Sequence, residues 1–341
     1  MDRNGIGGLG PGACRIAGWG VGMVATGGAV VGSTLGTAGS TLGTLYRGVR
    51  SIARPAGMRA AAVEAGWLTA HLALYPWGVL AEQLYPDGPY GHYRTETLNP
   101  VQRGLVIADI RAARTPILLV HGHADNRSVF AVFARALRRR GFGVVHAINY
   151  SVLTTLTGEV RGAARRLGQE VEQICEQTGA DEVHLVGHSL GGLVARYYVQ
   201  RLGGHARVHT LVTLGTPHGG TAVAYLLPTP MARQLRPDSD VVAELADPAP
   251  GCRTRFLAVW SALDQMVIPQ RNARLDHPDL GATNLRLRDV GHLSLLVDPR
   301  AVHAVATTLS RLEGAEPAGR PERAEPPTRI VTMGGGGSPA S

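Results

Sequence analysis

Lysine is absent from this chain of 341 residues, so arginine supplies all 34 of its basic side chains. Aromatic residues are also scarce, at 5% of the sequence. A net charge of +8 could indicate a nucleic-acid partner, but the exclusive use of arginine is more typical of a coding bias. The densest basic cluster, residues 138–140, lies at the end of a predicted helix, where the helix dipole stabilises cations. We therefore expect no nucleic-acid partner.

Cysteine is limited to Cys14, Cys175 and Cys252, an odd number with no close spacing. Such a set fits neither a zinc site nor a redox pair, so we expect no metal and no cofactor. Cys175 lies on the apolar side of a predicted helix, which is typical of a small buried side chain. Whether Cys175 and Cys252 pair depends on whether the fold brings them together, and the sequence leaves this open.

Charged residues are absent from residues 16–46, which are rich in glycine, serine and threonine. Small residues recur at every fourth position from Gly28 to Thr44, and on a helix they would form a stripe suited to close packing in lipid. A second uncharged stretch, residues 65–81, is short for a membrane span. We expect residues 1–100 to associate with a membrane or to carry an export signal, with the rest of the chain extracellular. Because glycine is dense here, a cytoplasmic protein with a flexible arm is the alternative.

From about residue 115 onwards, strand and helix signals alternate, which is typical of a parallel sheet covered by helices. Strands are predicted at residues 117–120, 144–148, 183–186, 208–214, 256–260 and 285–287. Helix ends are predicted at Asp125 or Asn126, at Gly179 and at Asp298. We place one α/β domain at residues 101–312. Residues 313–341 are rich in proline, glycine, arginine and glutamate, and we expect them to form a disordered tail.

Residues 183–192, V-H-L-V-G-H-S-L-G-G, contain a pattern typical of a catalytic nucleophile. It places Ser189 between Gly187 and Gly191, after an apolar strand and before a predicted helix at residues 190–202, which is the G-x-S-x-G pattern of a nucleophile elbow. A sharp strand-to-helix turn needs neighbours without side chains. The pattern alone is weak, since ordinary turns also match it, but here both flanks fit. We therefore predict that Ser189 is an exposed nucleophile.

A serine nucleophile needs a base to take its proton and a carboxylate to hold that base in the right tautomer. With this elbow, the acid and then the histidine are expected to follow the serine in the chain. Asp264 lies just beyond an apolar strand and His292 follows the last predicted strand, so we assign them as acid and base. Asp276 is the alternative acid. We interpret His277 and His303 as capping or solvent-exposed groups.

Charge that develops on a carbonyl oxygen needs preorganised N–H donors, here from the backbone. The N–H of Leu190, next to the nucleophile, is the first predicted donor. The second is the N–H of His123 in the loop after the first strand, where Gly122 allows the backbone to approach closely. The imidazoles of His121 and His123 are interpreted as polar loop groups bonded to nearby backbone.

Together these residues resemble the α/β-hydrolase superfamily and, more narrowly, bacterial serine lipases and esterases. The motifs are H-G at His121, G-H-S-L-G-G at Gly187, G-T-P-H-G-G at Gly215 and D-x-x-V-x-P at Asp264. The resemblance covers roughly residues 115–312. It implies an α/β-hydrolase fold, with a mostly parallel central sheet flanked by helices. It also implies hydrolysis of lipid or other acyl esters through an acyl-enzyme, with Ser189, Asp264 and His292 as the triad.

Residues 218–251 contain the run T-A-V-A-Y-L-L followed by prolines, which favours a short lid over the site. A surface helix packed on the core is the alternative. An acyltransferase or a thioesterase would share the same triad, so the sequence does not separate these activities from ester hydrolysis. A membrane-tethered binding protein on an inactive hydrolase fold is a further alternative, although such a protein would typically lack a triad member. Acyl chain length, head group and oligomeric state stay open.

Overall fold

The computed structural model describes the α/β part of the chain and short pieces before and after it. The described residues are 43, 55, 57–59, 62–67, 69, 73, 76, 114–123, 125–148, 158–311 and 330–333. The chain divides into two compact units, Met1–Thr44 and Leu45–Ser341. The predicted domain boundary near residue 100 therefore falls inside the second unit, and every contact described below belongs to that unit.

The N-terminal segments that the sequence directs to a membrane lie mostly outside the described residues. Within the part that is described, no helix combines the length and the apolar character needed to cross a membrane.

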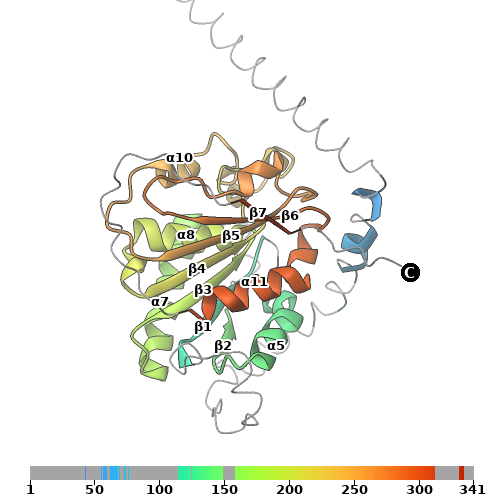
Figure 1. Ribbon diagram of the computed structural model, residues 1–341. Coiled ribbons are helices and arrows are strands. Elements are labelled where there is room, and N and C mark those ends of the chain that lie inside the picture. Colours follow the sequence, from blue (N-terminus) through green and yellow to red (C-terminus); the bar gives the residue numbers. More distant parts are fainter. Residues whose placement is uncertain are drawn as a thin grey trace, which may run out of the picture. The chain divides into compact units, whose positions relative to one another are not determined.

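A parallel sheet forms the centre of the fold (Figure 1). Its strands are β1 (Ile117–Val120), β2 (Val145–Ala147), β3 (Val183–His188), β4 (Val208–Leu214), β5 (Arg255–Ser261), β6 (Thr283–Leu287) and β7 (Ile330–Met333). The spatial order is β2-β1-β3-β4-β5-β6-β7, and every neighbouring pair is parallel. The predicted parallel sheet is confirmed. Its strand order reverses between β1 and β3, a point where open α/β sheets bind ligands at the carboxyl ends of their strands.

Helices cover both faces of this sheet (Figure 1). They are α5 (Ala131–Arg139), α7 (Val160–Thr178), α8 (Leu190–Arg201), α9 (Pro230–Arg233), α10 (Asp240–Ala246) and α11 (Pro299–Leu309). Helices α7 and α8 pack on one face, against Leu118 and Val120, while α5 and α11 pack on the other, against Ile117 and Leu119. Because successive side chains of a strand point to opposite faces, one apolar run fills both cores.

The helix ends follow local signals in the sequence. The side chain of Asn126 accepts a hydrogen bond from Ser128 N at 2.8 Å and begins the short helix η3 (Arg127–Phe130), which leads into α5. Gly179 ends α7 with a φ of 66°, a conformation that favours glycine. Asp298 caps α11 by accepting from the first backbone N–H groups of the helix. These three predictions are confirmed.

Strand β7 corrects the prediction for the C-terminal tail. The sequence predicts disorder throughout residues 313–341, yet Ile330–Met333 pairs in parallel with β6. The prediction is wrong for these four residues because the β-branched run I-V-T has strand propensity and can extend the open edge of β6.

The structure also shows whether Cys175 and Cys252 form a disulfide. Cys175 is buried in α7, as predicted, and Cys252 packs against the same apolar cluster. Both thiols are free. Burial raises the pKa of each thiol, so both are held as neutral SH groups. Cys14 lies outside the described residues.

Candidate active site

The predicted site residues gather at the carboxyl ends of the parallel strands. Ser189 follows β3 directly, Asp264 lies in the loop after β5, and His292 lies in the loop after β6. The loop after β1 also reaches this edge, beside β3. Because all of these strands run in the same direction, four loops that are far apart in the sequence meet at one edge.

Ser189 lies in the sharp turn that its motif predicts. Its backbone has φ 54° and ψ −124°, and it is the only non-glycine residue with a positive φ among those the structure describes. Its N–H donates to Leu214 O of β4 at 2.9 Å, which holds the turn against the sheet. A side chain in this region of φ and ψ is strained, and the surrounding structure must hold it there.

The glycines on either side of Ser189 make room for other backbone segments. A Cβ atom on Gly187 would lie 2.4 Å from Gly192 Cα, at the start of α8. A Cβ atom on Gly191 would lie 2.1 Å from Val120 O, at the end of β1. Backbone atoms cannot move aside as a flexible side chain can, so only glycine fits at both positions. The spacing of the motif thus follows from close packing of strand, turn and helix.

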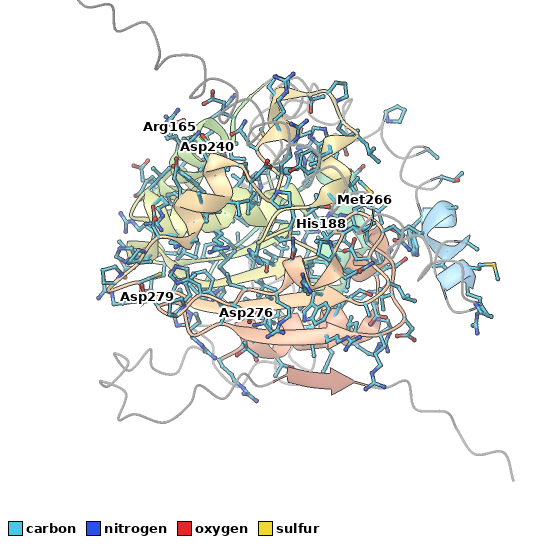
Figure 2. The ribbon with its side chains drawn as sticks, turned by 90° about the horizontal axis from the view of Figure 1, so that it is seen from above. Arg165, His188, Asp240, Met266, Asp276 and Asp279 are labelled. Carbon is cyan, nitrogen blue, oxygen red and sulfur yellow. The ribbon has the colours of Figure 1, made fainter. Side chains whose placement is uncertain are left out.

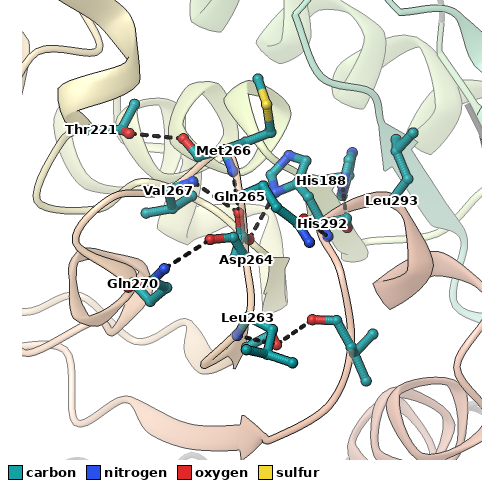
Figure 3. Close-up of polar contacts among 12 residues, drawn as sticks. His188, Thr221, Leu263, Asp264, Gln265, Met266, Val267, Gln270, His292 and Leu293 are labelled. Carbon is teal, nitrogen blue, oxygen red and sulfur yellow. Dashed lines mark hydrogen bonds and ion pairs between the residues drawn. The ribbon is translucent and has the colours of Figure 1, made fainter. Parts of the chain in front are cut away.

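Asp264 and His292 form a buried pair (Figure 3). Asp264 Oδ2 lies 2.8 Å from His292 Nδ1, and Asp264 Oδ1 accepts hydrogen bonds from Met266 N and Val267 N, each at 2.8 Å. These N–H groups fix the carboxylate in place. Because Nδ1 donates to the carboxylate, the neutral imidazole carries its lone pair on Nε2, where a general base needs it.

Further contacts fix the position of His292. His188 Nε2 donates to His292 O at 3.2 Å, and the centroids of the two rings are 4.7 Å apart. Since His188 directly precedes Ser189, this contact joins the turn of the nucleophile to the loop of the base. His292 N donates to Gln265 Oε1 at 3.3 Å. Gly215 has a φ of 58°, and a Cβ atom there would lie 3.0 Å from Asp264 Oδ2.

The two neighbouring imidazoles differ in their electrostatics. Burial by itself lowers the pKa of His292, but the nearby carboxylates of Asp264, Glu64 and Asp125, with Asp264 contributing most, together outweigh it. The pKa of His292 is therefore raised above its ordinary value. Burial and the nearby His292 lower the pKa of His188 to about 3. Of these two rings, His292 is therefore the more basic and the one suited to take up a proton.

The segments of the two predicted oxyanion donors lie beside the nucleophile. Leu190 is the first residue of α8 and follows Ser189 in the chain. In the loop after β1, a Cβ atom on Gly122 would lie 3.1 Å from Ser189 Cβ. This loop, which continues to His123, therefore passes next to the nucleophile. His121 Nδ1 donates to Gly122 O at 3.0 Å, which is the local backbone contact predicted for that imidazole.

The alternative acid and the other histidines lie elsewhere. Asp276 is in an ion pair with Arg274, its side chain is 56% exposed, and in the view of Figure 2 it lies apart from His188. His277 Nε2 donates to Asp247 O at 3.0 Å. His303 is exposed on α11. The structure thus brings Asp264, and not Asp276, to His292.

Residues 218–251 include the short helix η5 (Ala222–Tyr225) together with α9 and α10. Three hydrogen bonds join the start of η5 to the loop of the acid. Thr221 Oγ1 donates to Met266 O at 2.8 Å and accepts from Ile268 N at 3.0 Å, and Ala222 N donates to Ile268 O at 2.7 Å. Exposed apolar side chains lie on these two segments. They are Tyr225, Leu226 and Met266, of which Leu226 is 67% exposed.

Part of this chain is similar to known proteins. Residues 116–249 match the family model of palmitoyl protein thioesterase. Over 126 residues the chain is 35% identical to a triacylglycerol lipase of Burkholderia plantarii, covering 35% of this chain and 34% of that protein. Over 119 residues it is 34% identical to a triacylglycerol lipase of Pseudarthrobacter phenanthrenivorans, covering 33% and 36%. The chain thus spans about a third of the length of these curated relatives.

Among solved structures, Aspergillus fumigatus lipase B has a similar fold, with a TM-score of 0.51 and 18% identity over 65% of this chain and 60% of that chain. The parallel sheet and the strained serine turn after β3 define an α/β-hydrolase fold. The segment that the comparisons match is similar to lipases and esterases.

Proposed function

We propose that this protein is a serine hydrolase of carboxylic esters that cleaves lipid or other acyl esters through an acyl-enzyme. The observation that carries the proposal is the buried pair of His292 and Asp264, joined at 2.8 Å, beside the strained turn of Ser189. The similarity to two triacylglycerol lipases supports the same reaction class.

In the proposed reaction, Ser189 Oγ attacks the ester carbonyl carbon while His292 Nε2 takes its proton. Asp264 stabilises the imidazolium that forms. The N–H groups of Leu190 and His123 stabilise the oxyanion of the tetrahedral intermediate. His292 then gives the proton to the departing alcohol, which leaves Ser189 acylated. Water attacks the acyl group in a second round, with His292 again as base, and releases the carboxylic acid.

Exposed apolar side chains on the loop of the acid and on the neighbouring segment η5 favour a substrate with an apolar acyl group. Tyr225, Leu226 and Met266 can contact a fatty acyl chain or the surface of a lipid aggregate. We propose that residues 221–231 act as a lid, which opens when these side chains meet lipid. A lid of this kind predicts faster turnover of a long-chain ester above its solubility limit than below it. Equal specific rates on dissolved and emulsified substrate would contradict the lid.

The reaction class can be tested with p-nitrophenyl esters of increasing acyl chain length and with a fluorophosphonate probe. We expect ester hydrolysis and covalent labelling of the folded protein, both of which disappear in Ser189→Ala. His303→Ala is the matched control, because His303 is exposed on α11 and should keep full activity. A folded wild-type protein that neither hydrolyses any ester of the series nor reacts with the probe would refute the proposal.

A thioesterase activity is the second candidate, and the match of residues 116–249 to the palmitoyl protein thioesterase family favours it. The same triad would act, and only the leaving group would change from an alkoxide to a thiolate. Turnover of an acyl thioester and of an oxygen ester with the same acyl chain separates the two. A kcat/KM for the oxygen ester equal to or above that for the thioester supports the first proposal.

We also propose that residues before about 85 associate the protein with a membrane or direct it out of the cytosol. The support is the uncharged stretch of residues 16–46 with its stripe of small residues, followed by the apolar stretch of residues 65–81. Fractionation of the native host tests this. Recovery of the full-length protein entirely in the soluble cytosolic fraction, with its N-terminus intact, would contradict it.

A further inference from the structure

Glu64 lies far from the α/β part in the sequence, yet its carboxylate contacts the loop that carries His292. It belongs to a helical piece of residues 62–67. Its oxygens accept hydrogen bonds from Leu293 N, from Ser294 N at 3.1 Å and from Ser294 Oγ at 2.9 Å. Leu293 and Ser294 are the two residues that follow His292.

The contact has a clear physical basis at the start of the short helix η7 (Leu293–Leu296). The first N–H groups of a helix have no partner within the helix, and His292, which occupies the N-cap position, provides no side-chain cap. A carboxylate is favourable at this position because it accepts hydrogen bonds from these N–H groups. Glu64 supplies from a distant segment the cap that the loop itself lacks.

The contact extends to the other side of His292 as well. A Cβ atom on Gly291 would lie 2.3 Å from Glu64 Oε2, so the carboxylate fits only because residue 291 is glycine. The backbone on both sides of the base is thus in contact with Glu64. Together with Gln265, which accepts from His292 N, this leaves the base little freedom to move.

Several charged groups surround His292. Asp264 lies at Nδ1, Asp125 acts from the loop after β1, and Glu64 acts from the N-terminal helical piece; each raises the pKa of His292 against the effect of burial. His188 packs against the ring and, with its pKa near 3, is neutral. A cavity of about 300 Å³ beside the contact is also lined by the charged residues Arg59, Asp289 and Asp298.

We propose that Glu64 is a positioning residue for the catalytic base, which fixes the loop of His292 and stabilises the imidazolium that forms during attack. This inference rests on the proposed role of His292 as general base. If Glu64 has this role, residues 62–67 contribute to the active site although they precede the α/β part of the chain. A base held within a few tenths of an ångström transfers protons efficiently, and small displacements are costly in rate.

Two effects separate a positioning role from a purely structural one. In Glu64→Gln the cap is weakened and the charge is lost, so we expect kcat to fall by about tenfold with KM little changed. Because a carboxylate near the imidazole is removed, the acid limb of the kcat/KM profile should move to lower pH. Glu64→Asp keeps the charge, and its limb should stay closer to that of the wild type. Asp276→Asn, which removes a carboxylate of equal charge from the exposed pair with Arg274, should change neither quantity.

A titration without turnover keeps this test independent of the ester hydrolase proposal. The pKa of His292 can be followed by NMR in Ser189→Ala and in Ser189→Ala with Glu64→Gln, with His292→Gln to assign the signal. We expect a lower pKa when Glu64 is replaced, whatever the substrate of the protein is. An unchanged His292 titration, or a loss of kcat with no movement of the acid limb in a variant that melts like the wild type, would overturn the proposal.

Discussion

The turn that carries Ser189 and the loop that carries His292 lie at the same edge of the sheet but are held in different ways. The turn depends on its neighbours in the sequence, because Gly187 and Gly191 allow backbone segments to meet at distances that a side chain would prevent, and a backbone hydrogen bond to Leu214 O then holds it against the sheet. The loop is fixed by side chains from distant segments, namely Asp264, Gln265 and Glu64. The nucleophile is thus specified locally, whereas the base is specified by the tertiary fold.

The largest expected effect on activity comes from removing the nucleophile from the turn or the base from the loop. Ser189→Ala and His292→Ala should each reduce kcat/KM on the order of ten-thousandfold or more, because the two side chains act as one unit. For the same reason the double variant should be little worse than either single variant. Steady-state kinetics on purified, folded proteins measures this. Losses that multiply in the double variant would assign the role of base to another group.

Asp264→Asn should lower kcat by about a thousandfold without unfolding the protein. An amide at this position can still accept from Met266 N and Val267 N, but it no longer stabilises the imidazolium and can hold His292 in the wrong tautomer. Asp276→Asn is the matched control and should retain full activity, since Asp276 pairs with Arg274 at the surface. An equal loss in both variants would count against Asp264 as the partner of the base.

The local control of the turn can be tested through stability. Gly191→Ala brings a Cβ atom within 2.1 Å of Val120 O, and we expect it to lower the free energy of unfolding by about 3 kcal/mol or more. Gly162→Ala is the matched control, because Gly162 lies inside α7 with only the end of the Arg165 side chain near it. Alanine should stabilise this helix by about 1 kcal/mol. Denaturant unfolding of both variants measures the difference, and equal stabilities would show that the close approach at Gly191 is not required.

The smallest expected effect is on the pH dependence of kcat/KM, which reports the protonation of His292. Protonated His292 cannot take the proton of Ser189, so kcat/KM should fall as the pH drops through the pKa of His292. Asp264 raises this pKa against the effect of burial, so the midpoint should lie above that of an ordinary histidine. His188, with its pKa near 3, should add no inflection near neutral pH. A flat profile from mildly acid to neutral pH would contradict the assignment of His292.

Much of the fold was open to prediction from the sequence because its strands are buried on both faces and form short apolar runs between turns. The run at residues 183–186, for example, coincides with β3 apart from its last two residues. The run I-V-T-M of β7 has the same character, but it lies in a polar, proline-rich tail, and nothing local shows that it pairs with β6.

The candidate site also contains residues that the sequence predicts and residues that only the fold reveals. Ser189 follows from a local motif, and Asp264 and His292 follow from their positions after strands. His188 stands inside the elbow motif, but only the fold shows that its ring packs on His292. Glu64 carries no motif, and its bond to Ser294 spans 230 positions of the chain. Contacts across such separations depend on tertiary packing that no local pattern in one sequence records.

The proposed activity requires that Ser189 is a nucleophile activated by His292 and Asp264. The most direct measurement is to label the folded wild-type protein with a fluorophosphonate and to locate the adduct by peptide mass spectrometry. We predict a single adduct on Ser189, which does not form in Ser189→Ala and forms much more slowly in His292→Ala. An unlabelled Ser189 in the folded protein, or an adduct on a different residue, would contradict it.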